Sequence, residues 1–176
     1  PSGRRRCSTN IWTMRQVTYG DPARPIEMSL PPLTLQPPPG GSHAVRTFVT
    51  GHGQGNADNC AEFCARQHTL TAGGEAHTQD VWRTDCPTTA VPNQPGTWMY
   101  PRAGWCPGAM VHPWTVDLPA RAAPVTIAYD VADYVNSCRP EEPVCAGCTL
   151  GTGCAYDGGS HTEPHYQVSS VLISFQ

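Results

Sequence analysis

Glu62 lies midway between two cysteines in the stretch CAEFC at residues 60–64, and His68 lies four residues after Cys64. A carboxylate at such a place could activate water as a general base, whereas Cys60, Cys64 and His68 have spacings that zinc ligands also use. In an extended strand residues 60 and 64 would lie roughly 13 Å apart, and a disulfide needs Cα atoms about 4.4–6.8 Å apart. If the two cysteines pair, the segment must curl, and Glu62 then lies on the outside of a small ring.

The composition favours a disulfide over zinc at this place. The chain has 176 residues with 9 Cys, 19 Pro and 17 Gly, and 14% of its residues are charged. A loop-rich chain with many cysteines is typical of an exported protein that folds in an oxidising compartment. We therefore expect a secreted protein, extracellular or periplasmic, in which Cys60 and Cys64 are bonded to each other.

Charge and hydropathy exclude two classes of partner. The formal net charge is −3, and all 11 basic residues are arginines. Apart from Arg4, Arg5 and Arg6 these arginines are scattered, so they form no stripe that would follow a phosphate backbone. No apolar run approaches the roughly 18 residues of a membrane span. We expect neither a nucleic-acid partner nor a transmembrane segment.

Short runs of β-branched and aromatic residues, separated by Pro, Gly, Asn or Asp, predict an all-β fold. No stretch of ten or more residues keeps a helical stripe of apolar residues, because prolines interrupt nearly every candidate. About eight strands are expected, and they predict a single antiparallel β-sandwich or jelly roll. The Pro-rich residues 31–42 are expected to connect two strands. The expected strands are Ile11–Tyr19, Ile26–Leu30, Ala44–Thr50, His68–Ala72, Thr78–Arg83, Pro113–Leu118, Val125–Val135 and Tyr166–Phe175.

Two segments of the sequence carry a resemblance to a known family. They are GHGQGNADNCAEFCARQHTL from residue 51 and WRTDCPTTAVPNQPGTWMYPRAGWCPGAM from residue 82. Together they resemble the second, C-terminal jelly roll of the peptide-N-glycosidase F family, most specifically at CAEFC (60–64), at His68, and at RAGWCPG (102–108). The resemblance extends from about residue 17 to about residue 175. We therefore expect an N-terminal end with the approach to the first strand at 1–16, and the jelly-roll domain at 17–176.

The resemblance implies a disulfide-crosslinked, eight-stranded antiparallel jelly roll with the pairs Cys60–Cys64 and Cys86–Cys106. It also implies a function, because family members hydrolyse the amide bond between an N-glycan and asparagine without a metal. Glu62 matches the active-site glutamate that the second jelly roll contributes, and Arg102 falls on a motif whose arginine orients the site. Substrate contacts are expected from His52, Trp98 and Trp105, and the expected substrate is an N-glycoprotein or its glycan.

The resemblance also implies that the site has a second half. In the family the key catalytic aspartate belongs to the first jelly roll, and no aspartate of this chain matches its motif. We therefore expect this domain to contribute one half of the site, completed by an upstream jelly roll or a second chain. The alternative is a non-catalytic jelly roll that binds glycan, a partner protein or a metal ligated by histidine.

A metal is considered because His52 stands where the glycosidase has tryptophan. Copper-dependent peptidylglycine monooxygenases share the two-domain architecture and bind copper through histidines and a methionine. The candidate ligands are His52, His68, His77, Met110 and His112, since imidazole and thioether groups suit copper. We favour no cofactor, and copper is the candidate to consider if the domain binds a metal.

A second cluster of cysteines lies near the C-terminus, at residues 138–154. Its members are Cys138, Cys145, Cys148 and Cys154, which could form two disulfides in any of three pairings or a four-thiolate zinc site. We favour disulfides because the composition indicates an oxidising compartment. The family counterpart lacks this cluster, so we expect an insertion between the last two strands. Cys7 is then left without an assigned partner.

Overall fold

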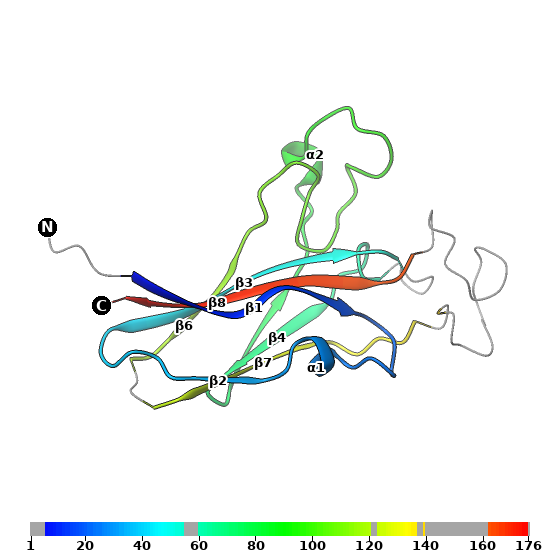
Figure 1. Ribbon diagram of the computed structural model, residues 1–176. Coiled ribbons are helices and arrows are strands. Elements are labelled where there is room, and N and C mark those ends of the chain that lie inside the picture. Colours follow the sequence, from blue (N-terminus) through cyan, green and yellow to red (C-terminus); the bar gives the residue numbers. More distant parts are fainter. Residues whose placement is uncertain (1–5, 55–59, 121–122, 137–138, 140–161, 176) are drawn as a thin grey trace, which may run out of the picture.

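The chain folds into two antiparallel sheets stacked face to face (Figure 1). A computed structural model describes residues 6–54, 60–120, 123–136, 139 and 162–175. One sheet has the strand order β1-β8-β3-β6, and the other has the order β2-β7-β4-β5. Within the described residues the fold is thus an eight-stranded sandwich, which confirms the fold class expected from the sequence.

Two one-turn helices accompany the strands. Helix α1 spans Ile26–Ser29 and helix α2 spans Cys86–Thr89. The strands are β1 (Arg6–Thr18), β2 (Leu33–Leu35), β3 (Ser42–His52), β4 (Gln67–Ala72), β5 (Glu75–Asp80), β6 (Trp114–Leu118), β7 (Val125–Val131) and β8 (His165–Phe175).

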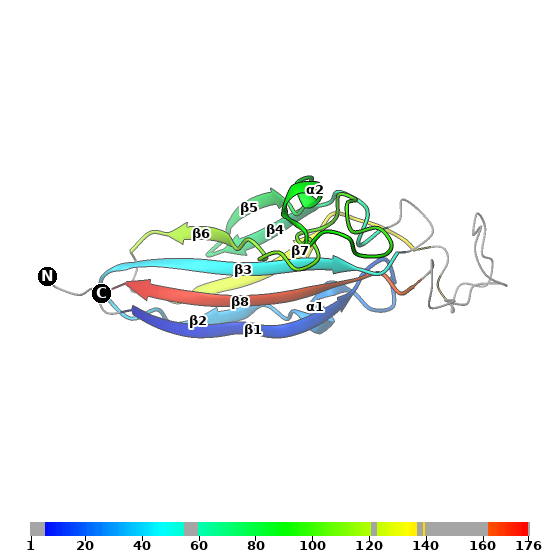
Figure 2. The same ribbon diagram turned by 90° about the horizontal axis from the view of Figure 1, so that it is seen from above.

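The core lies between the two sheets, which Figure 2 shows from above. Alternate residues of β8 are buried, as expected for a strand with one face on the core. The same alternation in β7 and β4 supplies the facing layer. The largest fully buried side chains include Tyr166, Leu172, Val45, Leu70, Ile127 and His68.

Strand β3 delivers the first segment of the candidate site. It pairs with β8 along its whole length and with β6 from His43 to Thr47. Its last residue, His52, lies opposite His165, the first residue of β8. The ladder with β8 therefore extends to the end of β3 and gives an ordered base for the residues that follow it.

One expected strand is a helix. Residues Ile26–Leu30 were expected to be extended, but Ile26–Ser29 form α1. Pro25 precedes the turn with extended backbone, and Glu27 and Met28 are good helix formers. Proline at 31 and 32 then ends it after one turn.

One strand lies where only a connector was expected. The Pro-rich residues 31–42 contain β2, a three-residue strand whose Leu33 and Leu35 are half-buried. It pairs with β7 at the edge of its sheet, where flanking prolines are tolerated because one side of the strand needs no ladder partner.

The other expected strands are present with shifted ends. The strand expected at Thr78–Arg83 is β5, which runs from Glu75 to Asp80, and β7 ends at Val131 rather than Val135. Gly73 and Gly74 both have positive φ and form the tight turn from β4 into β5. Residues 6–16, assigned above to the N-terminal end, form most of β1, which pairs with β8.

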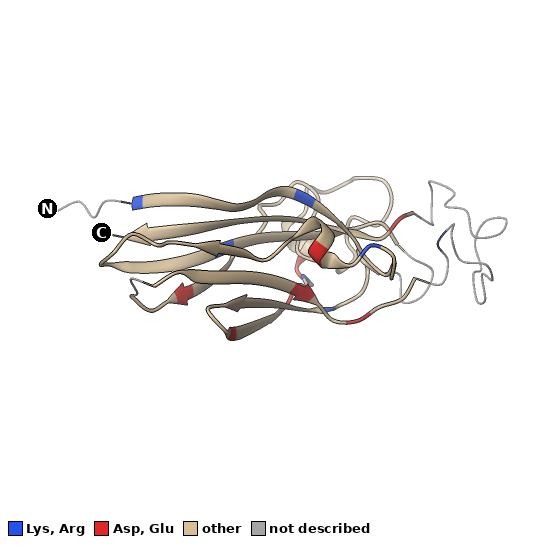
Figure 3. Ribbon diagram, turned by 60° about the horizontal axis from the view of Figure 1, so that its bottom comes forward, with Lys and Arg blue, Asp and Glu red and all other residues tan. Residues whose placement is uncertain are grey.

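The surface of the described residues fits the composition. Figure 3 shows acidic and basic residues interspersed over the ribbon rather than collected into one basic stripe. In the described part of the chain, no helix is long and apolar enough to cross a membrane.

Candidate active site

Three segments meet at the end of β3: residues 50–54, the ring at 60–64 and the loop at 97–106. The backbone of Glu62 joins them, because its N–H donates to the carbonyl of Gly53 (3.0 Å) and its carbonyl accepts from the N–H of Ala103 (2.9 Å). The carbonyl of Ala103 in turn accepts from the N–H of Gly51 (2.9 Å). The position of Glu62 is therefore fixed by backbone contacts on two sides.

Two disulfides secure these segments. Cys60 is bonded to Cys64 with a Cα–Cα distance of 4.9 Å, and Cys86 is bonded to Cys106 with a distance of 5.2 Å. Both pairs agree with the expectation from the resemblance. The first closes the ring that displays Glu62, and the second ties α2 to the loop at 97–106.

The side chains of Glu62 and Arg102 form an ion pair. An Nη1 hydrogen of Arg102 is donated to Glu62 Oε1 at 2.9 Å. The Arg102 side chain is 3% exposed and that of Glu62 is 17% exposed, so the arginine lies behind the carboxylate. Arg102 also donates to the backbone carbonyl of Thr97 and, at 3.4 Å, to that of Tyr100. The guanidinium group is thus occupied by this chain's own acceptors.

Aromatic rings lie on the guanidinium group. The Arg102 Cζ atom lies 4.7 Å from the ring centroid of Trp105 and 5.1 Å from that of Phe63. Such contacts stabilise a cation that has few water molecules around it. The indole N–H of Trp105 donates to the carbonyl of Gly51 at 2.8 Å, which anchors the tryptophan to β3. These contacts hold Arg102 in one orientation behind Glu62.

Burial changes the acid–base behaviour of the pair. It raises the pKa of the Glu62 carboxyl above its usual value, although the charge of Arg102 and the Gly53 backbone act in the opposite direction. Burial also lowers the pKa of Arg102, and the charge of Glu62 opposes that shift. The carboxylate at Glu62 is therefore more basic than an ordinary surface glutamate.

His52 lies beside this pair. Its ring centroid is 5.1 Å from that of Trp105 and 5.5 Å from that of His165, and its Nε2 lies 2.7 Å from the hydroxyl of Thr50. Burial lowers the pKa of His52 to about 4, and the neighbouring His165 and Arg102 add to the shift. His52 is accordingly neutral at pH 7, where it can donate or accept one hydrogen bond.

A hollow of about 310 Å³ opens next to the ion pair; we call it the site hollow. Its aromatic lining consists of Phe63, Tyr100 and Trp82, and Gln54, Thr97 and Pro101 complete it. Aromatic walls with a few polar groups are usual for sites that bind organic ligands. Glu62 and Arg102 do not line the hollow themselves, but Phe63 and Thr97, which both contact Arg102, do.

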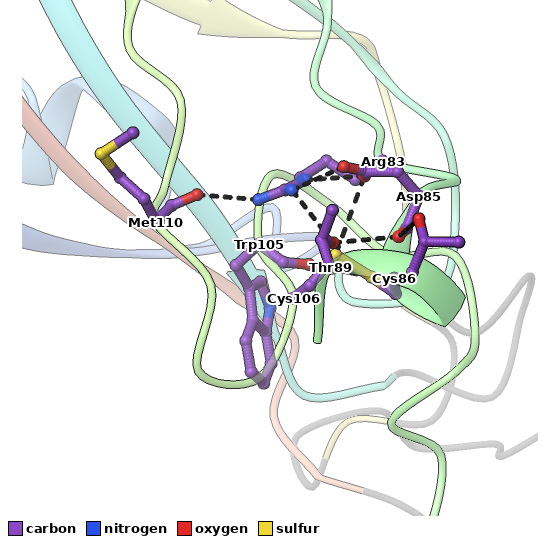
Figure 4. A network of polar contacts seen from close by, with 8 residues as sticks. Arg83, Asp85, Cys86, Thr89, Trp105, Cys106 and Met110 are labelled. Atoms are coloured by element: carbon purple, nitrogen blue, oxygen red, sulfur yellow. Dashed lines mark hydrogen bonds and ion pairs between the residues drawn. A yellow bond between two sulfur atoms is a disulfide. The ribbon is translucent and has the colours of Figure 1, made fainter. Parts of the chain in front are cut away.

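Arg83 secures the outer part of the same loop system (Figure 4). Its guanidinium group forms a fork onto the carboxylate of Asp85, at 2.9 and 2.8 Å, and donates to the carbonyl of Met110 at 2.8 Å. The ion pair lowers the pKa of Asp85 to about 2. The backbones of Arg83 and Arg102 exchange two hydrogen bonds, so this network adjoins the ion pair at Glu62.

Comparison with known proteins places this geometry in a family. A family model described as "Peptide-N-glycosidase F, C terminal" matches residues 35–149, which include the ring at 60–64 and the loop at 97–106. The chain belongs to the peptide-N-glycosidase F family. The resemblance drawn from the sequence is thereby confirmed.

A curated relative and solved structures agree with this assignment. The peptide-N(4)-(N-acetyl-beta-D-glucosaminyl)asparagine amidase F of Elizabethkingia miricola is 35% identical over 81 residues, which are 42% of this chain and 23% of that protein. A structure of such an amidase superposes with a TM-score of 0.74 at 20% identity. PNGase F, a glycosylasparaginase from Flavobacterium meningosepticum, gives 0.73 at 21%. These structures show the same fold. The whole chain is covered, but it spans only 54% and 53% of the two solved chains.

The site residues expected from the peptide-N-glycosidase F resemblance are not all brought together. Glu62, Arg102, His52 and Trp105 form one cluster. Trp98 instead packs against the small group formed by Cys86, Ala90 and Cys106, where it covers the disulfide. Its position favours a structural role over a contact with a bound sugar.

The candidate copper ligands do not converge. His68 is buried in the core, with its Nδ1 2.6 Å from the hydroxyl of Tyr129. His77 lies on β5, Met110 is exposed, and His112 lies in the loop before β6. Among the residues that the structure describes, no group of three or more His, Cys, Asp and Glu side chains is placed to hold a metal ion.

The remaining cysteines give no site within the described residues. The cluster at Cys138, Cys145, Cys148 and Cys154 lies outside them, so its pairing stays a prediction. Cys7 is exposed on β1 and is a free thiol.

Several site residues were not found by sequence reasoning. Phe63 lies inside the CAEFC motif and its ring covers Arg102, but the motif was interpreted only for its glutamate and cysteines. Thr97 and Tyr100 offer carbonyl oxygens, which any residue could supply, so their types carry no signal. His165 joins the site through its register opposite His52, which no local pattern specifies.

Proposed function

We propose that this chain contributes half of the active site of a secreted peptide-N-glycosidase, which hydrolyses the amide bond between an N-glycan and asparagine. The observation that carries the proposal is Glu62, a partly exposed carboxylate of raised pKa that is held from behind by a buried arginine. The next residue, Phe63, lines an aromatic hollow. Family membership and the name of the curated relative, an asparagine amidase, support the reaction class.

The chemistry assigned to Glu62 is that of a general base. The carboxylate accepts a proton from water, and the water oxygen attacks the amide carbon. The proton then passes from Glu62 to the amide nitrogen as the C–N bond breaks, which gives aspartate and a glycosylamine and returns Glu62 to its ionised form. A raised pKa makes Glu62 a better proton acceptor near neutral pH than an unperturbed glutamate. Its burial beside Arg102 also limits the number of orientations that the carboxylate can take.

Arg102 acts through Glu62 as a positioning residue. Its N–H groups are donated to Glu62 Oε1 and to the carbonyls of Thr97 and Tyr100, and its side chain is almost fully buried. This arrangement supports the orienting role that the resemblance implies for Arg102. Arg102 fixes the carboxylate and keeps it ionised, while the loop at 97–106 stays closed over the ring.

The other half of the site is proposed to come from outside this chain. Amide hydrolysis also needs donors for the oxyanion that forms on the carbonyl, and Arg102, the cation closest to Glu62, is already occupied. The solved relatives are nearly twice as long as the matched part. We assign the missing groups, including the family's aspartate, to a further jelly roll of the same protein or of a partner.

The test is release of glycan from a denatured N-glycoprotein. The chain is assayed alone and together with the first jelly-roll domain of a relative, with Glu62→Gln as the matched variant. We expect release only when both domains are present, and a loss of at least about 100-fold in the Glu62→Gln variant, since general-base catalysis contributes about 10²–10⁴-fold. Equal release by the variant, or no release from the combined domains, would contradict the proposal.

A further inference from the structure

A second hollow, of about 290 Å³, lies at the open edge of the sandwich; we call it the edge hollow. There β3 and β6 of one sheet face the end of β5 of the other, and the floor includes Thr47 of β3. No residue proposed above to act on the amide bond lines it. The walls are Trp82 and Trp114, and the rim carries Gln79, Asp80 and His112.

The lining of the edge hollow combines flat apolar faces with exposed polar groups. Both tryptophans are only partly buried and pack on the core through part of their surface. Gln79, Asp80 and His112 are exposed at the rim. An indole face covers apolar C–H groups, while carboxylate and amide groups bind hydroxyls. A pyranose ring presents both kinds of surface, so the hollow has the chemistry of a saccharide subsite.

The charges of the edge hollow disfavour an anionic ligand. Arg83 lines it, but its guanidinium group already donates hydrogen bonds to Asp85, to Thr89 and to the carbonyl of Met110. The carboxylates of Asp80 and Asp85 also line the hollow, and Asp85 stays ionised because the ion pair with Arg83 lowers its pKa to about 2. A phosphate or an acidic sugar would meet two carboxylates and no uncommitted arginine. A neutral, hydroxyl-rich ligand fits this lining.

The edge hollow adjoins the site hollow. Trp82 lines both of them, so the two spaces share this residue. The paired backbones of Arg83 and Arg102 also hold the residue after Trp82 against the segment that carries Pro101. A chain of sugar rings that starts beside Glu62 can therefore continue past Trp82 toward Trp114.

We propose that the edge hollow is an outer subsite for a neutral oligosaccharide, with Trp114 and Trp82 as stacking faces and Asp80 as a hydroxyl acceptor. The inference rests on the proposed function in one respect: the oligosaccharide is the distal part of the same N-glycan whose attachment sugar lies beside Glu62. The subsite adds selectivity for glycan length and leaves the chemistry at Glu62 unchanged.

The experiment is a titration of the full chain, followed by NMR, with three probes. The probes are a free neutral high-mannose oligosaccharide, N-acetylglucosaminyl-asparagine, and a Lys-rich peptide as a cationic control. Two variants address the edge hollow: Trp114→Ala, and Asp80→Ala at an exposed position where folding is not at risk. Phe48→Ala is the matched control, because Phe48 is a partly exposed aromatic of β3 outside both hollows. Thermal unfolding confirms that each variant is folded.

The subsite predicts that each edge-hollow variant weakens oligosaccharide binding about fivefold or more, while Phe48→Ala leaves it unchanged. Binding of N-acetylglucosaminyl-asparagine should be the same in all of these chains. Failure of the wild-type chain to bind the oligosaccharide, unchanged binding by both variants, or displacement of the oligosaccharide by the Lys-rich peptide would overturn the inference. If the chain binds the oligosaccharide as expected but the combined domains release no glycan in the assay above, the subsite stands and the proposed function is the part contradicted.

Discussion

At the scale of single residues, the pairing of Glu62 with Arg102 decides what the site can do. Removing one partner of a buried ion pair leaves the other charge without compensation, which is strongly destabilising when both are fully buried. Here the arginine is almost completely buried and the carboxylate is partly exposed. The charge of Arg102 therefore needs compensation by Glu62 more than the charge of Glu62 needs compensation by Arg102. A carboxylate that acts on water has to remain partly exposed in this way.

Replacing Arg102 should raise the pKa of Glu62 further. Burial already raises this pKa, and the charge of Arg102 is the main opposing influence. Arg102→Gln removes that charge, so the acid limb of any activity that depends on Glu62 should move to higher pH. The pKa can be measured by NMR titration of the labelled carboxyl carbon, with thermal unfolding as the test of folding.

Arg102→Lys is the matched control, because it keeps a positive charge but loses the guanidinium fork. The pKa of Glu62 should therefore rise less in Arg102→Lys than in Arg102→Gln. A pKa of Glu62 that is unchanged or lower in Arg102→Gln would show that the ion pair does not control this carboxyl.

His68 should make the fold less stable in acid. Burial lowers its pKa in the folded protein to about 3, from an ordinary value of 6.5. Between these two values the unfolded chain binds a proton that the folded chain does not, so stability is lost as the pH falls below about 6.5. The expected slope from His68 is about 1.4 kcal/mol per pH unit.

The measurement is urea unfolding at several pH values between 7 and 4. His68→Gln should remove the slope that His68 contributes. Tyr129→Phe deletes the hydroxyl that contacts His68, so it should lower stability at every pH but keep the slope. Parallel curves for wild type and His68→Gln would contradict the assignment of a buried neutral histidine.

At the scale of elements, the loop at 97–106 is packed against β3 through Gly104. Its φ is +77°, and a Cβ built there would lie 2.1 Å from the carbonyl oxygen of Val49. Gly104→Ala should therefore lower the stability of the fold by more than the unfavourable positive φ alone would. Gly96 in the same stretch has φ +81° but open space around the added carbon, so Gly96→Ala is the matched control.

We expect Gly96→Ala to lower the free energy of unfolding by about 1 kcal/mol and Gly104→Ala by clearly more, about 3 kcal/mol. Chemical denaturation measures both. Equal losses in the two variants would mean that the loop does not approach β3 as closely as the structure shows.

The two disulfides should differ in how much they stabilise the fold. In the chain-entropy model the bridge between Cys86 and Cys106 contributes about 3 kcal/mol, and that between Cys60 and Cys64 about 2 kcal/mol, because it closes a shorter loop. Double substitutions to alanine, compared by urea unfolding, check the order. A larger loss on removing Cys60 and Cys64 would show that the ring at 60–64 does more than display Glu62.

At the scale of the whole molecule, alternation of apolar residues was enough to predict the sandwich. It failed at residues 26–30, where one isoleucine suggested a strand but prolines on both sides leave room for a single helical turn. It also missed β2, because a three-residue edge strand between two runs of proline, at 31–32 and 37–39, has almost no periodicity. Short elements depend on their neighbours more than on their own pattern.

The candidate site was predictable only in part for a similar reason. Glu62 and Arg102 belong to motifs with unusual residues, so the resemblance identified them. The hollows, by contrast, are formed by Phe63, Trp82 and Trp114, which come from separate segments. In the sequence these aromatics are indistinguishable from core residues, because their exposure depends on how segments far apart in the chain pack together.

The central claim is that Glu62 serves hydrolysis of the glycan–asparagine amide, and the mass of the product peptide tests it most directly. A synthetic N-glycopeptide is incubated in ¹⁸O-water with this chain and the first jelly roll of a relative. We expect a peptide with aspartate in place of the glycosylated asparagine and one ¹⁸O in the new carboxyl group, and no such product with Glu62→Gln. A peptide that still carries asparagine, or one that keeps an N-acetylglucosamine, would contradict it.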